Sequence, residues 1–125
     1  MLERSERRII GRPTDIGGDL LEIRGLGVID VKALYGESAT IDRCEVGLVV
    51  ELEEWKKGVY YSILGLRERR YKILGANLPY LKLPVKPGRN MATLIEVAAR
   101  NQMLKEQGIY TARDLNRKLN KRLAQ

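Results

Sequence analysis

The chain has 125 residues and a mass of 14.2 kDa, enough for one compact domain and too little for two ordinary ones. Hydrophobic residues make up 44% and charged residues 31%, a composition typical of a folding globular chain. One cysteine and no histidine exclude an internal disulfide, a cysteine-based zinc site and histidine catalysis. Carboxylates remain as metal ligands, and they suit a hard cation such as Mg²⁺.

The formal charge is +7, and most of it lies near the C-terminus. Residues 100–125 contain seven basic and two acidic side chains, so this tail contributes +5. Such an excess favours an anionic partner: nucleic acid, phosphate or an acidic protein surface. The N-terminal MLERSERR has no apolar stretch behind it, and the apolar run from Met91 to Ala99 is interrupted by Glu96. We therefore expect a cytoplasmic protein without a membrane segment.

The first third of the chain predicts short elements. Arg8 to Gly11 is an apolar run typical of a strand, whereas Asp19 to Arg24 is too short to classify by periodicity. Asp30 is a good N-cap for a short helix from Val31 to Tyr35, which Gly36 would end.

Three strands are expected in the middle of the chain: Val46 to Leu52, Tyr71 to Leu74, and Tyr80 to Val85. In the first of them, apolar residues occupy both odd and even positions, as in strands that are buried on both faces of a sheet. A turn at residues 75–77 would separate the other two, and Pro79 and Pro84 would keep them short.

Two helices are expected in the last third. Asn90 would cap a helix that runs to about Gln107 and stops at Gly108, with one side formed by Leu94, Val97, Ala98, Asn101 and Leu104. Thr111 and Asp114 resemble a capping box for a last, basic helix in which Leu115, Leu119 and Leu123 recur every four residues. Strands followed by helices predict an α/β or α+β layer, with the long helix over a sheet.

The segment from Leu20 to Val31 could carry chemistry. Glu22 and Arg24 precede the turn Gly25-Leu26-Gly27, so a metal-bound phosphate could meet both charges and nearby backbone amides. It is no dinucleotide-binding fingerprint, because Asp30 stands where a third glycine belongs. From these residues alone, an ordinary loop with solvated charges is the favoured interpretation, because the chain has 12 glycines and one G-x-G pattern among them is weak evidence.

The segment from Pro84 to Asn90 places Lys86 and Arg89 on a Pro-Gly turn directly before the long helix. Helix N-termini favour anions, and two cations there would add donors for phosphate. The residues alone leave a second interpretation equally open, in which this is only a strand-to-helix connection. For the basic last helix we expect protein or subunit contacts rather than nucleic acid, because only Tyr110 is available there for base stacking.

Together the two segments resemble a known family. Leu20 to Val31 resembles the signature of the HPr kinase/phosphorylase family. Pro84 to Asn90, with Ile95-Glu96-Val97-Ala98-Ala99 after it, resembles that family's second conserved loop and the following helix. The resemblance runs from about Gly11 to Gly108 and includes the strand ending near Trp55.

The resemblance implies a fold and a function. The fold would be a P-loop/PEP-carboxykinase-like α/β domain, present over residues 1–125 as a single incomplete domain with a partial sheet, a long helix and a basic C-terminal helix. Family members are cytoplasmic hexamers that use ATP and Mg²⁺ to phosphorylate a serine of HPr, the phosphocarrier of the sugar phosphotransferase system, and that remove this phosphate by phosphorolysis. By motif, the implied roles are metal binding for Glu22, catalysis for Arg24, Lys86 and Arg89, and cofactor binding for Gly25, Gly27 and Gly88.

The chain departs from the family pattern in ways that bear on activity. It contains no G-x-x-x-x-G-K-[ST] loop, and the family's catalytic aspartate and active-site histidine also belong to sequence upstream. Ile63 stands where an arginine before Leu64-Gly65-Leu66 is usual, and Arg67 is four residues away. Lys86 stands where the family's second loop has an arginine, so the bidentate hydrogen bonds of a guanidinium are lost at this position. We expect weak Mg²⁺ binding, and neither ATP binding nor kinase activity by this chain alone.

Three interpretations follow from these departures. The chain is a fragment of a full enzyme, a stand-alone paralogue that keeps HPr or subunit contacts without catalysis, or a basic binding module. We favour the first, although Ile63 supports the second because truncation would not change that position. An incomplete sheet should expose an apolar edge and face, and the chain should then associate with itself or a partner.

Overall fold

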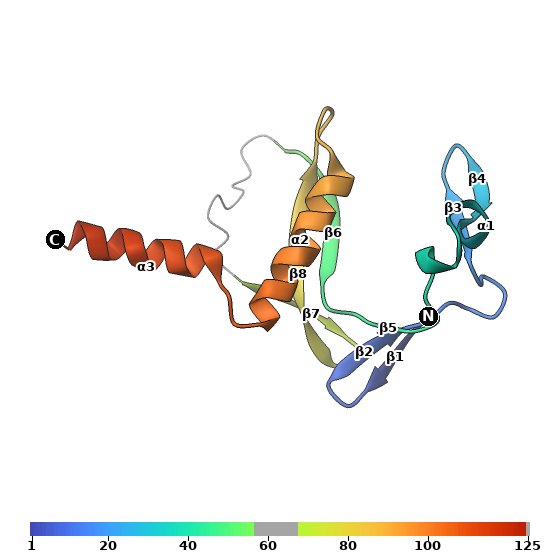
Figure 1. Cartoon of the computed structure of the whole chain (residues 1–125), viewed down its shortest axis with the longest axis horizontal. Coiled ribbons are helices and arrows are strands. Elements are labelled where there is room, and N and C mark those ends of the chain that lie inside the picture. Colours follow the sequence, from blue (N-terminus) through green and yellow to red (C-terminus); the bar gives the residue numbers. More distant parts are fainter. Residues whose placement is uncertain (57–67, 125) are drawn as a thin grey trace. The chain divides into compact units, whose positions relative to one another are not determined.

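The computed structural model describes residues 1–56 and 68–124 (Figure 1). The chain divides into two compact units, Met1–Val46 with Lys72–Asn77 and Gly47–Tyr71 with Leu78–Gln125. The single domain expected over residues 1–125 stays a prediction. Ile63, Arg67 and residues 64–66 lie outside the described residues.

The first unit contains an antiparallel sheet in the order β1-β2-β5, formed by Leu2–Ser5, Arg8–Gly11 and Cys44–Glu45. Strand β2 confirms the strand expected at Arg8 to Gly11, and its central Ile9 and Ile10 are buried. Strand β1 was not expected, because two of its four residues are charged and only Leu2 is apolar. The charged residues also stabilise the pairing of the two strands, because the guanidinium of Arg12, directly after β2, lies 3.4 Å from the carboxylate of Glu3 in β1.

A hairpin and two short helices also belong to the first unit. Strands β3 (Leu20–Ile23) and β4 (Gly27–Asp30) pair antiparallel, and α1 (Val31–Tyr35) and the 3-10 helix η1 (Glu37–Ala39) follow. The expected caps of α1 are confirmed. The carboxylate of Asp30 accepts a hydrogen bond from the amide of Ala33 at 3.0 Å, and Gly36 ends the helix with a positive φ of 91°.

A second sheet has the order β6-β8-β7 and is formed by Val49–Glu54, Ala76–Val85 and Arg69–Ile73. It belongs to the second unit except for residues 72–77 around the β7–β8 turn, which belong to the first. Strands β6 and β8 are parallel and in register from Val49 opposite Tyr80 to Glu54 opposite Val85. Strand β6 starts three residues later than expected, because Val46 donates its amide to the carbonyl of Ile9 in the other sheet at 2.8 Å. The expected burial of β6 on both faces is wrong for the described structure, since Leu52 is 49% exposed.

The connection between β7 and β8 also differs from expectation. The turn lies at Leu74 and Gly75, whose φ angles of 48° and 81° are those of a tight hairpin turn, and not at residues 75–77. Strand β8 runs through Pro79 and Pro84, which were expected to keep the strands short. Pro79 is tolerated because the parallel ladder with β6 begins only at Tyr80.

Helix α2 (Met91–Glu106) confirms the long helix. The Asn90 side chain accepts from the amide of Thr93 at 3.1 Å, and Gly108, with φ of 88°, follows the C-terminal end. The expected packing face is only partly right: Leu94 and Ala98 are partly covered, whereas Val97, Asn101 and Leu104 are exposed.

Helix α3 (Thr111–Leu123) confirms the last helix but not its capping box. The N-cap is Tyr110, with no side-chain cap hydrogen bond, and the amide of Asp114 bonds to the carbonyl of Tyr110 at 3.0 Å. No described helix is long and apolar enough to cross a membrane.

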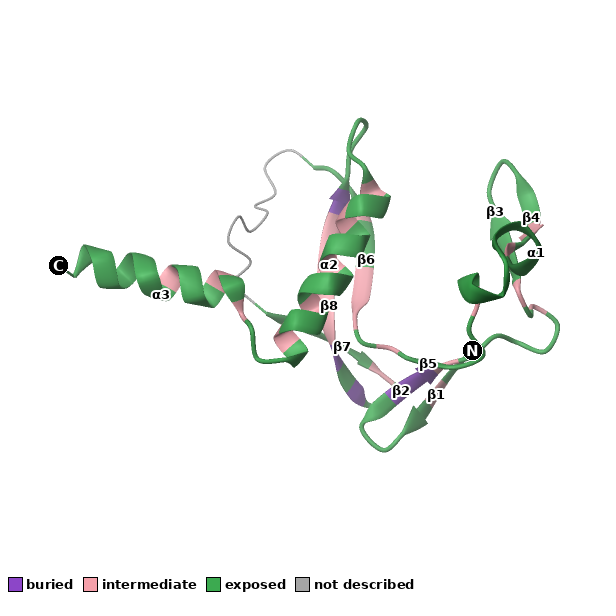
Figure 2. Ribbon diagram, in the orientation of Figure 1, coloured by how far each residue is buried: buried purple, intermediate pink, exposed green. Residues whose placement is uncertain are grey.

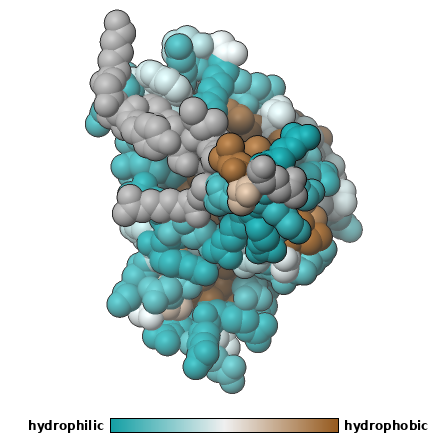
Figure 3. All heavy atoms as spheres, turned by 90° about the vertical axis from the view of Figure 1, so that its left-hand side faces the viewer, coloured by the Kyte–Doolittle hydropathy of each residue, from teal (hydrophilic) through white to brown (hydrophobic). Residues whose placement is uncertain are grey.

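Few apolar side chains of the described residues are buried: Ile9, Ile10, Ala76 and Leu78. Many large ones are exposed, and Figure 2 shows buried residues only at isolated places along the ribbon. Brown apolar patches lie open between hydrophilic side chains in Figure 3. The expected apolar exposure is confirmed, whereas the association that it should cause stays a prediction.

One face of the second unit's sheet carries a polar and aromatic network. Tyr80 donates a hydrogen bond to the carboxylate of Glu51, stacks on Tyr71 with ring centroids 5.6 Å apart, and lies under the guanidinium of Arg69 at 5.4 Å. The bond to Glu51 favours the protonated phenol and, with burial and the nearby negative charge, raises the pKa of Tyr80 above its usual 10.0. The network therefore ties neighbouring strands together.

We predict that Glu51→Gln lowers the pKa of Tyr80 toward 10.0. Because the pKa is raised in the folded chain, the network's stabilisation is fully present below pH 10.0 and is lost as pH rises through the higher folded-state pKa. Ultraviolet titration of the tyrosines, with Tyr80→Phe to assign the signal, measures the shift. Glu54→Gln, a neighbouring carboxylate that does not shift this phenol, is the matched control. An unchanged Tyr80 pKa in Glu51→Gln would refute this prediction.

We further predict that Asn90→Ala lowers the free energy of unfolding by about 1 kcal/mol, because it removes the cap bond to Thr93. Asn101→Ala is the control, since it makes the same substitution at an exposed position inside α2, where alanine favours the helix. Urea denaturation followed by circular dichroism measures both. Equal losses in the two variants would argue against a capping role.

Candidate anion-binding site

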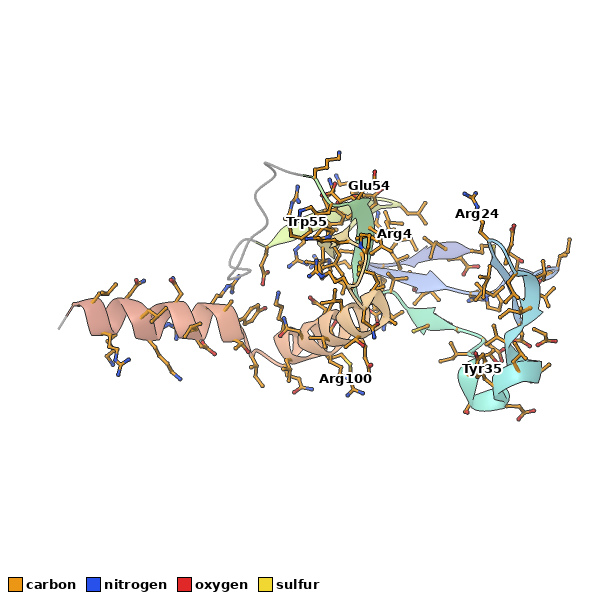
Figure 4. The ribbon with its side chains drawn as sticks, turned by 90° about the horizontal axis from the view of Figure 1, so that it is seen from above. Arg4, Arg24, Tyr35, Glu54, Trp55 and Arg100 are labelled. Atoms are coloured by element: carbon orange, nitrogen blue, oxygen red, sulfur yellow. The ribbon has the colours of Figure 1, made fainter. Side chains whose placement is uncertain are left out.

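The first candidate segment forms the β3–β4 hairpin of the first unit. Glu22 pairs with Val28 across the hairpin, and Arg24, Gly25 and Leu26 form its tip. Gly25 and Gly27 have φ angles of 91° and 107°, which disfavour any side chain, so both glycines are needed for the backbone turn. The segment is exposed, and Arg24 projects from the ribbon (Figure 4).

Glu22 does not gain further metal ligands from this hairpin. Among the described residues no three His, Cys, Asp or Glu side chains come close enough to hold a metal ion. A lone carboxylate fits Mg²⁺ only in part, because the ion keeps several waters and relies on substrate phosphates for its other ligands. Glu22 therefore remains a candidate for one ligand of such an ion and not for a complete site.

The second candidate segment forms a tight turn in the second unit, directly after β8. The amide of Arg89 bonds to the carbonyl of Lys86 at 3.1 Å, and Gly88 has a φ of 84°. Proline followed by glycine at the two central positions is typical of a type II turn, which requires a positive φ at the second of them. Gly88 is thus explained by the turn itself, whether or not it approaches a cofactor.

The two cations of this turn are held by uncharged groups. The ammonium of Lys86 lies 5.3 Å from the ring centroid of Trp55. The guanidinium of Arg89 donates to the carbonyl of Pro84 at 3.2 Å, which leaves most of its donors for other partners. No carboxylate of the described residues forms an ion pair with either cation. The turn therefore keeps two uncompensated positive charges.

The surrounding elements suit an anion. Strands β6 and β8 are parallel, so their carboxyl ends meet at one edge, where open α/β sheets usually bind ligands. Helix α2 begins at Met91, just after the turn, and its N-terminal end is electropositive. The amide of Thr93 is already taken by Asn90, so not every N–H at this end is available. The arrangement can bind a phosphate group with charge-assisted hydrogen bonds.

The structure brings together only some of the expected residues. Glu22, Arg24, Gly25 and Gly27 share one hairpin of the first unit, whereas Lys86, Gly88 and Arg89 share one turn of the second. Trp55 was missed as part of the second group. Its contact with Lys86 depends on the pairing of β6 with β8, and no local sequence signal reveals that register.

Helix α3 carries a separate surface feature. A shallow hollow is lined by Leu115, Lys118, Leu119, Lys121 and Arg122. The leucines are the expected apolar stripe, and they remain 45% and 43% exposed at Leu115 and Leu119. An exposed apolar stripe beside cations is suited to contact with another protein.

Comparisons with known proteins agree with this fold. The family model for the HPr serine kinase C-terminal domain matches residues 1–119. The HPr kinase/phosphorylase of Thermoanaerobacter pseudethanolicus is 41% identical over 119 residues, 95% of this chain and 39% of the relative. That of Geobacter sulfurreducens is 42% identical over 111 residues, 89% of this chain and 35% of the relative.

A solved structure, the HPr(Ser) kinase/phosphatase from Coxiella burnetii, matches with a TM-score of 0.77 and 34% identity. The match covers 86% of this chain and 66% of that one, and it confirms the expected α/β fold. The chain spans less than two fifths of the length of the curated relatives described above. The extent of the family match over residues 1–119 nevertheless settles the classification: this chain belongs to the HPr serine kinase C-terminal domain family.

Proposed function

We propose that this chain is the C-terminal part of an HPr serine kinase/phosphorylase, which transfers phosphate to and from a serine of HPr in carbon catabolite regulation. The relative from Thermoanaerobacter pseudethanolicus, named HPr kinase/phosphorylase, matches 95% of the chain and supports the assignment. The observation that carries it is the turn at Lys86 and Arg89, with two uncompensated cations at the carboxyl edge of a parallel strand pair. In this proposal the turn binds the phosphate of serine-phosphorylated HPr.

Phosphoryl transfer suits such a turn. The transferred group carries charge on its equatorial oxygens, and catalysis depends mainly on positioning and on neutralising that charge. Lys86 and Arg89 would supply donors at this turn. Within the first unit, the β3–β4 hairpin would separately offer Arg24 as a cation for phosphate oxygens and Glu22 as one ligand of Mg²⁺, which would supply further neutralisation.

The chain alone is not expected to act as a kinase. Its 125 residues contain no phosphate-binding loop of the G-x-x-x-x-G-K-[ST] type, so we propose that ATP does not bind without further polypeptide. The exposed apolar residues support the participation of further polypeptide in the fold. Leu52 on a parallel strand and Val85 at a strand end would normally be covered. Additional sequence, as in the longer relatives, would cover them.

A second candidate function is docking without catalysis. The hollow on α3, with its exposed leucines and three basic residues, favours binding to HPr or to another subunit. In this alternative the chain would recognise HPr through α3, and the phosphate on its serine would matter little.

We predict that the 125-residue chain binds serine-phosphorylated HPr at least about tenfold more tightly than unmodified HPr, because a charge-assisted hydrogen bond contributes about 1.5–3 kcal/mol. Isothermal titration calorimetry measures both affinities. Lys86→Met/Arg89→Met should remove the preference. Lys118→Met/Lys121→Met, an equal loss of charge on α3, should preserve it. Equal affinity for the two forms of HPr, combined with loss of binding in the α3 variant, would favour docking alone.

Activity assays separate the remaining possibilities. With Mg²⁺ and ATP we expect no phosphorylation of HPr by the isolated chain. Phosphate release from serine-phosphorylated HPr, in the presence of Mg²⁺ and inorganic phosphate, should also be absent. Turnover that disappears in Lys86→Met/Arg89→Met would show that the turn works without the phosphate-binding loop and would contradict this expectation.

A further inference from the structure

The contact between Trp55 and Lys86 joins the ends of two parallel strands. Trp55 directly follows β6, and Lys86 directly follows β8. The amide of Trp55 donates to the carbonyl of Val85 at 3.1 Å, so the parallel ladder fixes the tryptophan backbone beside the end of β8. Figure 4 shows Trp55 at this end of β6, next to Glu54. The indole is therefore brought to Lys86 by backbone pairing.

The contact restrains Lys86 without neutralising it. A lysine side chain is long and flexible, and its ammonium loses rotamer entropy when it is held in one place. Tryptophan is the side chain whose ring attracts cations most strongly, and the 5.3 Å separation lies within the range of a cation–π interaction. A carboxylate would also restrain the ammonium, but it would compete with an incoming anion. The indole leaves the positive charge in place.

We propose that Trp55 is a positioning residue for Lys86 and thereby sets the affinity of the Lys86–Arg89 turn for a phosphate group. Trp55 itself does not contact the phosphate. Arg89 is held separately, through its bond to the carbonyl of Pro84, so loss of the indole should affect one cation and leave the other in place. The inference rests on the proposed function for the choice of phosphate as ligand.

The test is a double-mutant cycle with inorganic phosphate as the probe. Phosphate is titrated into the 125-residue chain at constant ionic strength, and binding is followed by phosphorus NMR. Trp55→Leu should weaken binding roughly twofold to fivefold, the value expected for a cation–π contact at an exposed site. In the Lys86→Met background, Trp55→Leu should have no further effect, because the two side chains act as one unit.

Two further variants keep the test specific. Trp55→Phe retains an aromatic face and should keep part of the affinity, which guards against a folding defect in Trp55→Leu. Tyr110→Leu removes a similar pair elsewhere, in which the guanidinium of Arg113 lies 4.3 Å from the ring centroid, and should leave phosphate affinity unchanged. Circular dichroism checks the fold of each variant.

Trp55 provides an independent readout because it is the only tryptophan in the chain. Phosphate should change its fluorescence in the wild-type chain and in Tyr110→Leu, and should leave it unchanged in Lys86→Met. If Lys86→Met weakens phosphate binding but Trp55→Leu does not, the positioning role is wrong and the proposed function stands. If Lys86→Met has no effect on phosphate binding, the turn is not the phosphate site, and both proposals fail.

Discussion

The parallel pairing of β6 with β8 is the constraint on which the candidate site depends. Parallel strands run in the same direction, so the residues that follow them emerge at one edge. Here this places Trp55 beside Val85 and brings its indole to Lys86. Antiparallel pairing of the same strands would put the ends of β6 and β8 at opposite edges. The charge of the turn would be unchanged, but its support would be lost.

The same pairing makes the exposure of apolar residues on these two strands unusual. Parallel strands are usually covered on both faces, whereas an antiparallel sheet tolerates one solvated face. The polar network of Glu51 and Tyr80 gives the second unit's sheet one face of the latter kind. Leu52 and Val85 are 49% and 38% exposed, which is unusual for apolar residues of a parallel pair. Coverage by further polypeptide, as proposed, would resolve this exposure.

The sequence predicted features that depend on neighbouring residues. The caps at Asp30 and Asn90 and the turn at Pro87-Gly88 are local, because each hydrogen bond joins residues three positions apart. The charged strand β1 was not predictable in this way, since its formation depends on pairing with β2. The packing face of α2 and the contact between Trp55 and Lys86 likewise depend on tertiary structure. In the candidate site, the cations could therefore be predicted but their support could not.

The support by Trp55 also bears on the expectation from the sequence that Lys86 stands where an arginine is usual in the family. An arginine could stack its planar guanidinium on the indole and still present a fork to phosphate, whereas a lysine presents a point charge on a flexible stem. A lysine therefore depends more on an external restraint to keep its ammonium in place. The indole supplies that restraint without cancelling the charge, so the substitution removes bidentate geometry but preserves a positioned cation. The guanidinium of Arg89, which donates to the carbonyl of Pro84, is then the one group of the turn that can still bind phosphate in a bidentate manner.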